Sequence, residues 1–305
     1  HQAVRQVVGD NAKSHAALSS LCWLSVFAAT HARPRRYADY LAMLGSVRKK
    51  KWRKAMFLDR LLADAFITQV RRTRPDFATL FLNAAAHIQH HYMFSSSAYE
   101  GELSNPEWHV RATDDPLLDV YQLYDQVVGD VRTHFPEARL MIATGLHQDP
   151  YHELAFYWRL RDHDDFLQRH DIAFENVDAL MSRDFVVTCA DAEQAVRTES
   201  QLASFSGDDG LPLFEIDNRG ETLFVMLTYP KDIPADFLYR YGAEQRTGLR
   251  EAVAFVAIKN GKHNGIGYFC DTGAPEKSGD RMPLTSMPDH IWSALCPDVE
   301  RIRTS

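Results

Sequence analysis

Cysteine is scarce in this sequence. The 305 residues include 4 cysteines, which stand far apart: Cys22, Cys189, Cys270 and Cys296. No CxxC pair is present, so the sequence offers neither a thiol redox motif nor a cysteine zinc site. A chain of this length can bury enough apolar surface to fold without disulfides. Scattered cysteines fit a reducing compartment better than an oxidising one, which favours the cytoplasm.

Glycine-rich phosphate loops are also absent. Neither GxGxxG nor GxxxxGK[ST] occurs, which excludes the usual dinucleotide and nucleoside-triphosphate loops. GxSxG is missing too, so the nucleophile turn of an α/β-hydrolase is not present. The net charge is -7 and the pI is near 6.1. A general nucleic-acid-binding protein is usually basic, so no nucleic-acid partner is predicted.

Long apolar runs are missing as well. The longest mostly apolar stretch is 16–30, "AALSSLCWLSVFAAT". It is shorter than the roughly 20 residues that a membrane span needs, and serines interrupt it. We therefore expect a buried helix there and no membrane span. The chain opens on His1 in helix-like sequence, which predicts that it begins inside a longer protein.

The composition that remains is typical of a soluble globular protein, with 45% hydrophobic and 25% charged residues. Apolar positions at helical spacing predict helices over 55–74, 115–135 and 191–205. Short apolar runs predict strands at 77–83, 138–146, 184–190, 251–261 and 265–271. The segment 213–229 reads as a hairpin around "DNRG".

Helices that alternate with short apolar strands predict an α/β fold. The expected architecture is one domain over 1–305, a three-layer α/β/α sandwich with a mostly parallel central sheet. The region 150–250 departs from strict alternation, and we expect it to form a smaller cap or insert.

Several histidines follow predicted strand ends, where ligands bind in open α/β sheets. His87 and His90 come after the strand that ends at Asn83. His147 and His263 follow two later strands. Imidazole suits zinc and similar metals, so converging loops would form a metal site. The alternative is that these are ordinary hydrogen-bonded or surface histidines, as most single histidines are.

Three ordered landmarks resemble the alkaline phosphatase superfamily, in particular its type I phosphodiesterase/nucleotide pyrophosphatase branch. "AHIQHHYM" (86–93) is similar to the family's Asp-x-x-x-His motif, with His90 at the ligand histidine. "ATGLHQ" (143–148) is similar to Ser-Asp-His-Gly, with His147 at the histidine. "KHNGIGYFCDTG" and "PLTSMPDHIWSAL" are similar to the late His-Gly landmark and its following helix, with His263 at the ligand.

The resemblance implies an alkaline-phosphatase-like fold and a metal-dependent hydrolase of small-molecule phosphate esters, phosphodiesters above all. It implies a two-metal site, usually of zinc, that stabilises the charge on a transferring phosphoryl group. The implied metal ligands are His90, His147 and His263, with His87 as a fourth. Candidate substrate-binding residues are Asn83, Lys259 and Asn260. The first strand and the nucleophile would lie upstream of His1.

Two positions depart from the family pattern. Ala86 stands at the aspartate of Asp-x-x-x-His, and Leu146 stands at the aspartate of Asp-His. Carboxylates supply much of the charge that balances divalent cations. A shifted register would use Asn83 and His87, or His87 would take over the role of the lost carboxylate. The alternative function is a catalytically impaired family member that acts as a binding or regulatory protein. A third reading is an unrelated α/β protein with histidines on its loops.

Overall fold

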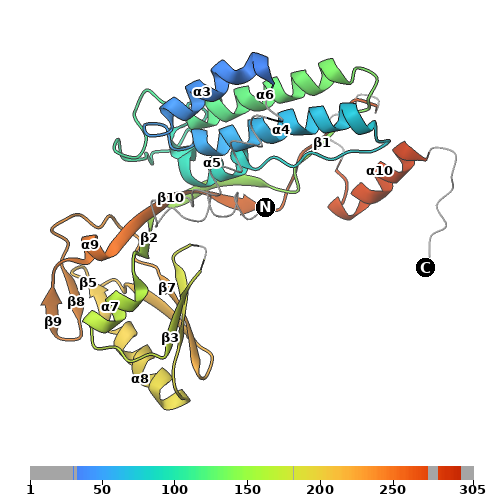
Figure 1. The fold of residues 1–305 in the computed structure, drawn as a ribbon. Helices are drawn as coiled ribbons and strands as arrows, with labels where there is room; N and C mark the ends of the chain where they lie inside the picture. Colours follow the sequence, from blue (N-terminus) through green and yellow to red (C-terminus); the bar gives the residue numbers. More distant parts are fainter. Residues whose placement is uncertain (1–29, 31–32, 181, 274–280, 297–305) are drawn as a thin grey trace, which may run out of the picture. The chain divides into compact units, whose positions relative to one another are not determined.

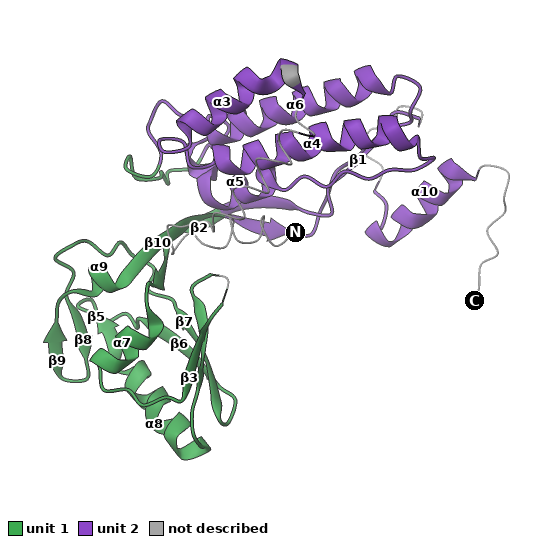
Figure 2. Cartoon of the chain, viewed as in Figure 1, with its two compact units in different colours: residues 1–27, 101–109, 151–260 green, residues 28–100, 110–150, 261–305 purple. Residues whose placement is uncertain are grey.

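The computed structural model describes residues 30, 33–180, 182–273 and 281–296. The chain divides into two compact units (Figure 2). Unit 1 takes its described residues from Gly101–His109 and Tyr151–Asn260, and unit 2 from Ala28–Glu100, Val110–Pro150 and Gly261–Ser305. The apolar run at 16–30, predicted to be a buried helix, lies outside the described residues except for Thr30.

Unit 2 is mainly helical (Figure 1). Its elements are η1 (Pro34–Arg36), α3 (Tyr37–Ser46), α4 (Arg53–Thr73), α5 (Ala84–Tyr92), η2 (Met93–Ser95), α6 (Pro116–His134), β1 (Met141–Ala143), β11 (Phe269–Asp271), η3 (Leu284–Ser286) and α10 (Met287–Leu295). Helix α4 packs against α3, α5 and α6. Apolar side chains from this group form a core that includes Trp52, Ile88 and Val120. This core fixes α5, the helix that carries the histidine cluster.

The helices predicted at 55–74 and 115–135 are confirmed as α4 and α6. The Asp115 side chain caps α6 by accepting a hydrogen bond from the N–H of Leu118. Pro116 occupies the first turn, where its missing N–H interrupts no helical hydrogen bond. Local sequence chemistry therefore sets where α6 begins.

Two strands predicted in unit 2 are largely wrong. Residues 77–83 are extended, but they belong to no strand, and Phe81 is 79% exposed. Of 138–146, only β1 is a strand, and it pairs antiparallel with β11. An apolar run becomes a strand only where a neighbouring strand bonds to its main chain. In the part of the chain that the structure describes, 77–83 has no such neighbour.

Strands β2 (His147–Leu160) and β10 (Val253–Asn264) pair in a two-stranded sheet, and each has residues in both units. The strand predicted at 251–261 is confirmed as β10. Within the described ranges, no helix combines the length and apolar character that a bilayer span requires.

Unit 1 is built on a four-stranded antiparallel sheet in the order β3-β4-β7-β6. Its elements are α7 (His163–Arg169), β3 (Asn176–Ala179), β4 (Asp184–Thr188), α8 (Ala192–Ala203), β5 (Phe205–Gly207), β6 (Phe214–Asn218), β7 (Thr222–Leu227), β8 (Tyr239–Tyr241), β9 (Glu244–Arg246) and α9 (Leu249–Ala252). The predicted hairpin around "DNRG" is confirmed as β6 and β7. Gly220 has φ of 94° in its turn. The predicted α8 is confirmed, and Asp191 caps it through the N–H of Gln194.

The predicted fold class is wrong. The sheets described contain two to four strands, and the strand registers that define β1, β3–β9 and β11 are all antiparallel. They do not form the mostly parallel central sheet of an α/β/α sandwich. The burial of β4 shows why: Phe185 and Val187 are buried while the residues between and beside them are half-buried. This alternation is typical of a sheet with one covered face, whereas a parallel strand is apolar on both faces.

Candidate functional site

Two predicted metal ligands lie in direct contact within unit 2. His90 is in the last turn of α5, and His263 is near the end of β10. Although 173 positions separate them, their Nε2 atoms are 2.8 Å apart. Their ring centroids are 4.6 Å apart. The fold therefore brings together two imidazoles from remote parts of the sequence.

Gly261 allows β10 to pass this close to α5. A β-carbon at Gly261 would lie 2.8 Å from the main-chain oxygen of Gln89 in α5. Real β-carbons do not approach main-chain atoms so closely, so glycine is required here for steric reasons. The carbonyl oxygen of Gly261 also lies 3.4 Å from Nδ1 of His90. One residue thus sets the spacing between helix and strand and contacts a site histidine.

We expect Gly261→Ala to push β10 away from α5 and to lower the free energy of unfolding by about 1–3 kcal/mol, because the main chain of α5 has no room to yield. Urea unfolding measures this. The matched control is Gly45→Ala in α3, where an added β-carbon meets nothing within 4 Å. There alanine is expected to be neutral or to stabilise by up to about 1 kcal/mol, because it favours a helix over glycine. Equal effects of the two substitutions would contradict the assignment.

The hydrogen-bond partners indicate which ring nitrogens carry hydrogen. A carbonyl oxygen only accepts, so Nδ1 of His90 donates to Gly261 and its Nε2 presents a lone pair. Nε2 of His263 then donates in the 2.8 Å contact. Two nitrogens that each lie about 2.0–2.1 Å from a tetrahedral zinc ion are about 3.3 Å apart, so the rings would need to separate by about 0.5 Å. The pair would therefore fit a metal ion after a small side-chain movement and the loss of the hydrogen from Nε2 of His263.

His87 and His91 extend the cluster along α5. The ring of His91 lies 4.9 Å from that of His87 and 5.9 Å from that of His90, centroid to centroid. Burial lowers the pKa of His87, and a positive charge on His90 or Lys54 lowers it further. The His87 side chain is therefore mainly uncharged at pH 7. It can offer a nitrogen donor, but it cannot supply the negative charge that a carboxylate at position 86 would bring.

His147, the third predicted ligand, has protein partners on both ring nitrogens. Its Nδ1 lies 2.6 Å from the carbonyl oxygen of Ile266, and its Nε2 lies 3.0 Å from Oδ1 of Asp149. Asn264 donates to the other carboxylate oxygen of Asp149 at 2.8 Å. The hydrogen bond from Asn264 lowers the pKa of Asp149, and the contacts with His147 and the charge of Lys262 act in the same direction. This arrangement ties the start of β2 to the end of β10 beside His263.

Asn83, a candidate substrate-binding residue, begins α5 through its main chain. The N–H groups of Asn83 and Ala84 donate to Oδ2 of Asp59 at 2.9 and 2.7 Å. The hydroxyl of Tyr124 donates to the same oxygen at 2.6 Å. Burial raises the pKa of Asp59, although these three hydrogen bonds oppose the rise. A buried carboxylate from α4 therefore caps the helix that carries His87 and His90.

The other two candidate substrate-binding residues lie in unit 1. The ammonium group of Lys259 is 3.7 Å from the ring centroid of Tyr151, a cation–π contact. Asn260 is fully buried, and its amide exchanges two hydrogen bonds with Asn105, at 2.8 and 3.0 Å. Both side chains have partners inside unit 1, whereas the histidine pair belongs to unit 2. The two predicted substrate-binding residues therefore do not share a compact unit with the predicted ligands.

Sequence reasoning missed the residues that support the cluster. Asp149 follows His147 by two positions, so its proximity could have been inferred. Asp59 lies on a helix whose pattern resembles any amphipathic helix, and only the fold shows that it caps α5. Asp271 was also missed: its side chain is 1% exposed and binds Arg139 and His290. The hydrogen bond from Arg139 holds the pKa of Asp271 well below its usual range.

Comparison with known proteins identifies no relative. No protein-family model, curated protein or solved structure matches the chain. Within the described residues, no group of three or more His, Cys, Asp and Glu side chains is arranged to hold a metal ion. The donors therefore do not fit the two-metal site that the resemblance implies. What they offer is one pair of imidazoles, His90 and His263, with further histidines beside it.

Proposed function

We propose that unit 2 binds one divalent transition-metal ion at His90 and His263, and that the chain hydrolyses small-molecule phosphate esters there. The observation that carries the proposal is the 2.8 Å contact between their Nε2 atoms, which joins α5 to β10. The order of the three sequence landmarks supports phosphate esters as substrates. These two histidines stand at the ligand positions of two of those landmarks.

The chemistry of the donors favours one class of metal. Imidazole nitrogen binds zinc, copper and nickel well, whereas magnesium and calcium prefer carboxylate and carbonyl oxygen. Ala86 and Leu146 supply no oxygen at the positions where the family has aspartates. When bound, such an ion would activate water and draw charge from a phosphoryl oxygen. Water or substrate would complete its coordination.

The protein's own residues orient the donors. The carbonyl of Gly261 accepts from Nδ1 of His90, which directs Nε2 toward His263. Partners of this kind hold the tautomer and the ring orientation of metal-binding histidines. Asp149 and Asn264 hold the end of β10, so the position of His263 depends on their hydrogen bond.

We expect the purified chain to bind about one zinc ion and to hydrolyse bis(p-nitrophenyl) phosphate only with zinc present. His90→Ala and His263→Ala should each lower zinc affinity by at least about tenfold and abolish turnover, because each removes half of the donor pair. Calorimetry and metal analysis after dialysis measure binding. The control is His152→Ala, since His152 is a largely exposed histidine of unit 1. Zinc content that is unchanged in both site variants would overturn the proposal.

A second function follows from the sparse donor set. Within the described residues no third His, Cys, Asp or Glu side chain is arranged with the pair to hold a metal ion, which favours a protein that binds metal and phosphate ester without turnover. The same experiment separates the two functions. Zinc binding that His263→Ala abolishes, without hydrolysis by the unaltered chain, supports the binding protein. Zinc-dependent hydrolysis by the unaltered chain, which His263→Ala also abolishes, supports the enzyme.

A further inference from the structure

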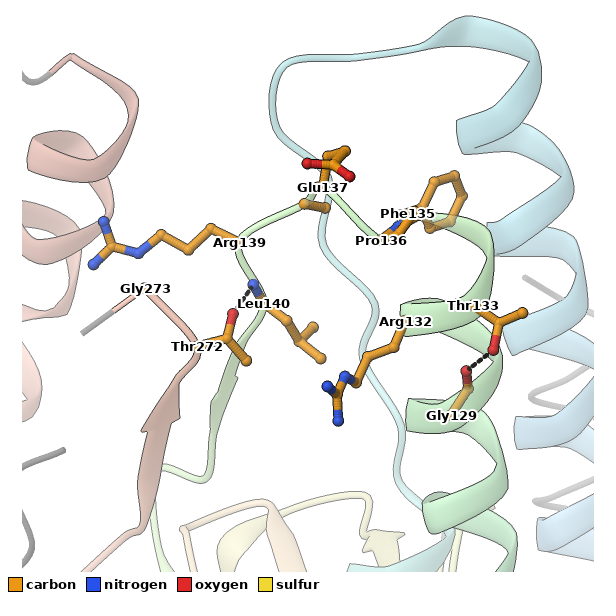
Figure 3. Close-up of a pocket in the computed structure, with 11 residues that line it drawn as sticks. Gly129, Arg132, Thr133, Phe135, Pro136, Glu137, Arg139, Leu140, Thr272 and Gly273 are labelled. Atoms are coloured by element: carbon orange, nitrogen blue, oxygen red, sulfur yellow. Dashed lines mark hydrogen bonds between the residues drawn. The ribbon is translucent and has the colours of Figure 1, made fainter. Parts of the chain in front are cut away.

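A hollow of about 710 Å³ lies in unit 2, and none of the landmark histidines is among its lining residues (Figure 3). It is formed by the last turns of α6, the loop from α6 to β1, and the residues that follow β11. This volume is within the range of small-molecule sites, roughly 300–1,000 Å³. The apolar residues that line the hollow include Phe135 and Leu140. The polar residues that line it include Arg132, Arg139 and Thr272.

Two glycines shape the walls. Gly129 lies inside α6, where glycine is less favourable than alanine by about 1 kcal/mol. A β-carbon there would meet no atom within 4 Å, so the absent side chain leaves this wall open. Gly273 acts differently: a β-carbon there would lie 2.5 Å from the side chain of Arg139. Glycine at 273 therefore lets Arg139 lie against the main chain.

The two arginines differ in their partners. Arg139 is held by Asp271 through two hydrogen bonds of 2.9 and 2.6 Å, so its charge is balanced. Arg132 extends from α6 into the space between α6 and β1, as Figure 3 shows. Among the residues that the structure describes, Arg132 has neither a hydrogen bond nor an ion pair through its side chain. The hollow therefore contains a cation whose charge no neighbour balances directly.

We propose that this hollow binds a small organic anion whose carboxylate or phosphate contacts Arg132. A guanidinium presents a planar fork of N–H donors that matches both groups. The apolar carbon skeleton of the ligand would lie against Leu140 and fill the space beside Gly129. Glu137, an exposed carboxylate on the wall, opposes an anion, so its removal should tighten binding.

The test uses the full chain in zinc-free buffer, titrated with benzoate and with phenyl phosphate and followed by heteronuclear NMR. We expect saturable shifts at Gly129, Arg132 and Thr272. Arg132→Gln should weaken binding at least tenfold, and Gly129→Leu should abolish it by filling the open wall without disturbing the helix. Glu137→Gln should tighten binding several-fold. Inorganic phosphate, which lacks a carbon skeleton, should bind more weakly than phenyl phosphate.

The matched control is Arg72→Gln, which removes an exposed arginine from the last turn of α4. It should leave the titration unchanged. His263→Ala should also leave it unchanged, which separates this site from the histidine pair. Equal weakening by Arg72→Gln and Arg132→Gln would show general charge attraction and overturn the proposal. So would shifts that survive Gly129→Leu, or the absence of any saturable shift.

Discussion

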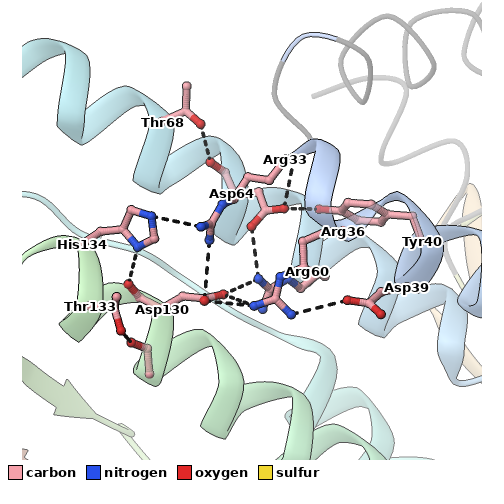
Figure 4. A network of polar contacts seen from close by, with 11 residues as sticks. Arg33, Arg36, Asp39, Tyr40, Arg60, Asp64, Thr68, Asp130, Thr133 and His134 are labelled. Carbon is pink, nitrogen blue, oxygen red and sulfur yellow. Dashed lines mark hydrogen bonds and ion pairs between the residues drawn. The ribbon is translucent and has the colours of Figure 1, made fainter.

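Asp64→Ala is expected to lower the free energy of unfolding by about 3–5 kcal/mol, because it removes one partner from a buried charge network. Figure 4 shows the network between α3, α4 and α6. Asp64 is 0% exposed and Arg60 is 1% exposed, and they form an ion pair of 3.2 Å one helical turn apart on α4. The hydroxyl of Tyr40 donates to Asp64 at 2.7 Å. With alanine at position 64, Arg60 and Tyr40 each lose the carboxylate oxygen that accepts their hydrogen bond.

The rest of the network shows why the loss is large. Asp130 of α6 binds Arg36 at 2.7 Å and also contacts Arg60 and Arg33. Burial tends to raise the pKa of Asp130, but the hydrogen bonds and charges of Arg60 and Arg36 outweigh it and lower the pKa. Asp130 is thus already occupied by three guanidiniums. It cannot fully compensate Arg60 when Asp64 is removed, and a buried charge without its partner is costly.

Thermal or urea unfolding measures the change. The matched control is Asp165→Ala, because Asp165 and Arg169 form a pair of the same i,i+4 spacing on α7, with side chains 47% and 65% exposed. Solvent screens that pair, so its loss should cost less than about 1 kcal/mol. The double variant Arg60→Met/Asp64→Leu should be more stable than the sum of its single changes predicts, because no charge stays unpaired. Equal losses in Asp64→Ala and Asp165→Ala would contradict this account.

Local chemistry made the helices predictable. Asp115 and Asp191 stand where a side-chain oxygen can accept from the first turn, and both cap helices. The hairpin around "DNRG" was equally local, since Gly220 supplies the positive φ that its turn needs. These features depend on residues a few positions apart, so the sequence contains the whole cause.

Strand pairing could not be predicted in the same way, because a strand needs a partner elsewhere in the chain. Phe81 lies in an apolar run like that of β4, yet it is exposed and its segment pairs with no strand in the described part of unit 2. The candidate site shows the same division. The sequence predicted a shared cleft for His90, His147 and His263, but neither the direct contact of His90 with His263 nor the hydrogen bond of His147 to the carbonyl of Ile266 could be inferred from local sequence, because both depend on tertiary structure.

Asp59→Ala is expected to lower the stability of the fold and to disturb the histidine site, because Asp59 caps α5, the helix that carries His87 and His90. Its Oδ2 accepts from the N–H groups of Asn83 and Ala84 and from the hydroxyl of Tyr124. Asp59 is 7% exposed, so water cannot readily replace it. Each buried donor left without an acceptor costs about 1–3 kcal/mol. We therefore expect a loss of about 3 kcal/mol or more in the free energy of unfolding.

The effect should reach the histidine pair, the proposed zinc site, through α5. When its first turn loses the cap, the helix shifts relative to α4, and His90 moves away from His263. Substitution of a residue that orients a metal ligand typically lowers metal affinity by about 10–100-fold, and we expect Asp59→Ala to lower zinc affinity by a factor in that range. Calorimetry on folded protein measures this. The loss of stability should appear whether or not the histidine pair binds zinc, so the two outcomes test separate claims.

Asp59→Asn distinguishes capping from charge. The amide oxygen still accepts from main-chain N–H groups, and burial already opposes the charged form of Asp59 by raising its pKa. Asparagine should therefore retain most of the stability that alanine loses. The control is Asp191→Ala, which removes the cap of α8 in unit 1 and should cost about 1 kcal/mol. Because α8 carries no site histidine, that variant should leave zinc affinity unchanged. If Asp59→Ala and Asp191→Ala had the same effects on stability and zinc affinity, Asp59 would have no special role in positioning α5.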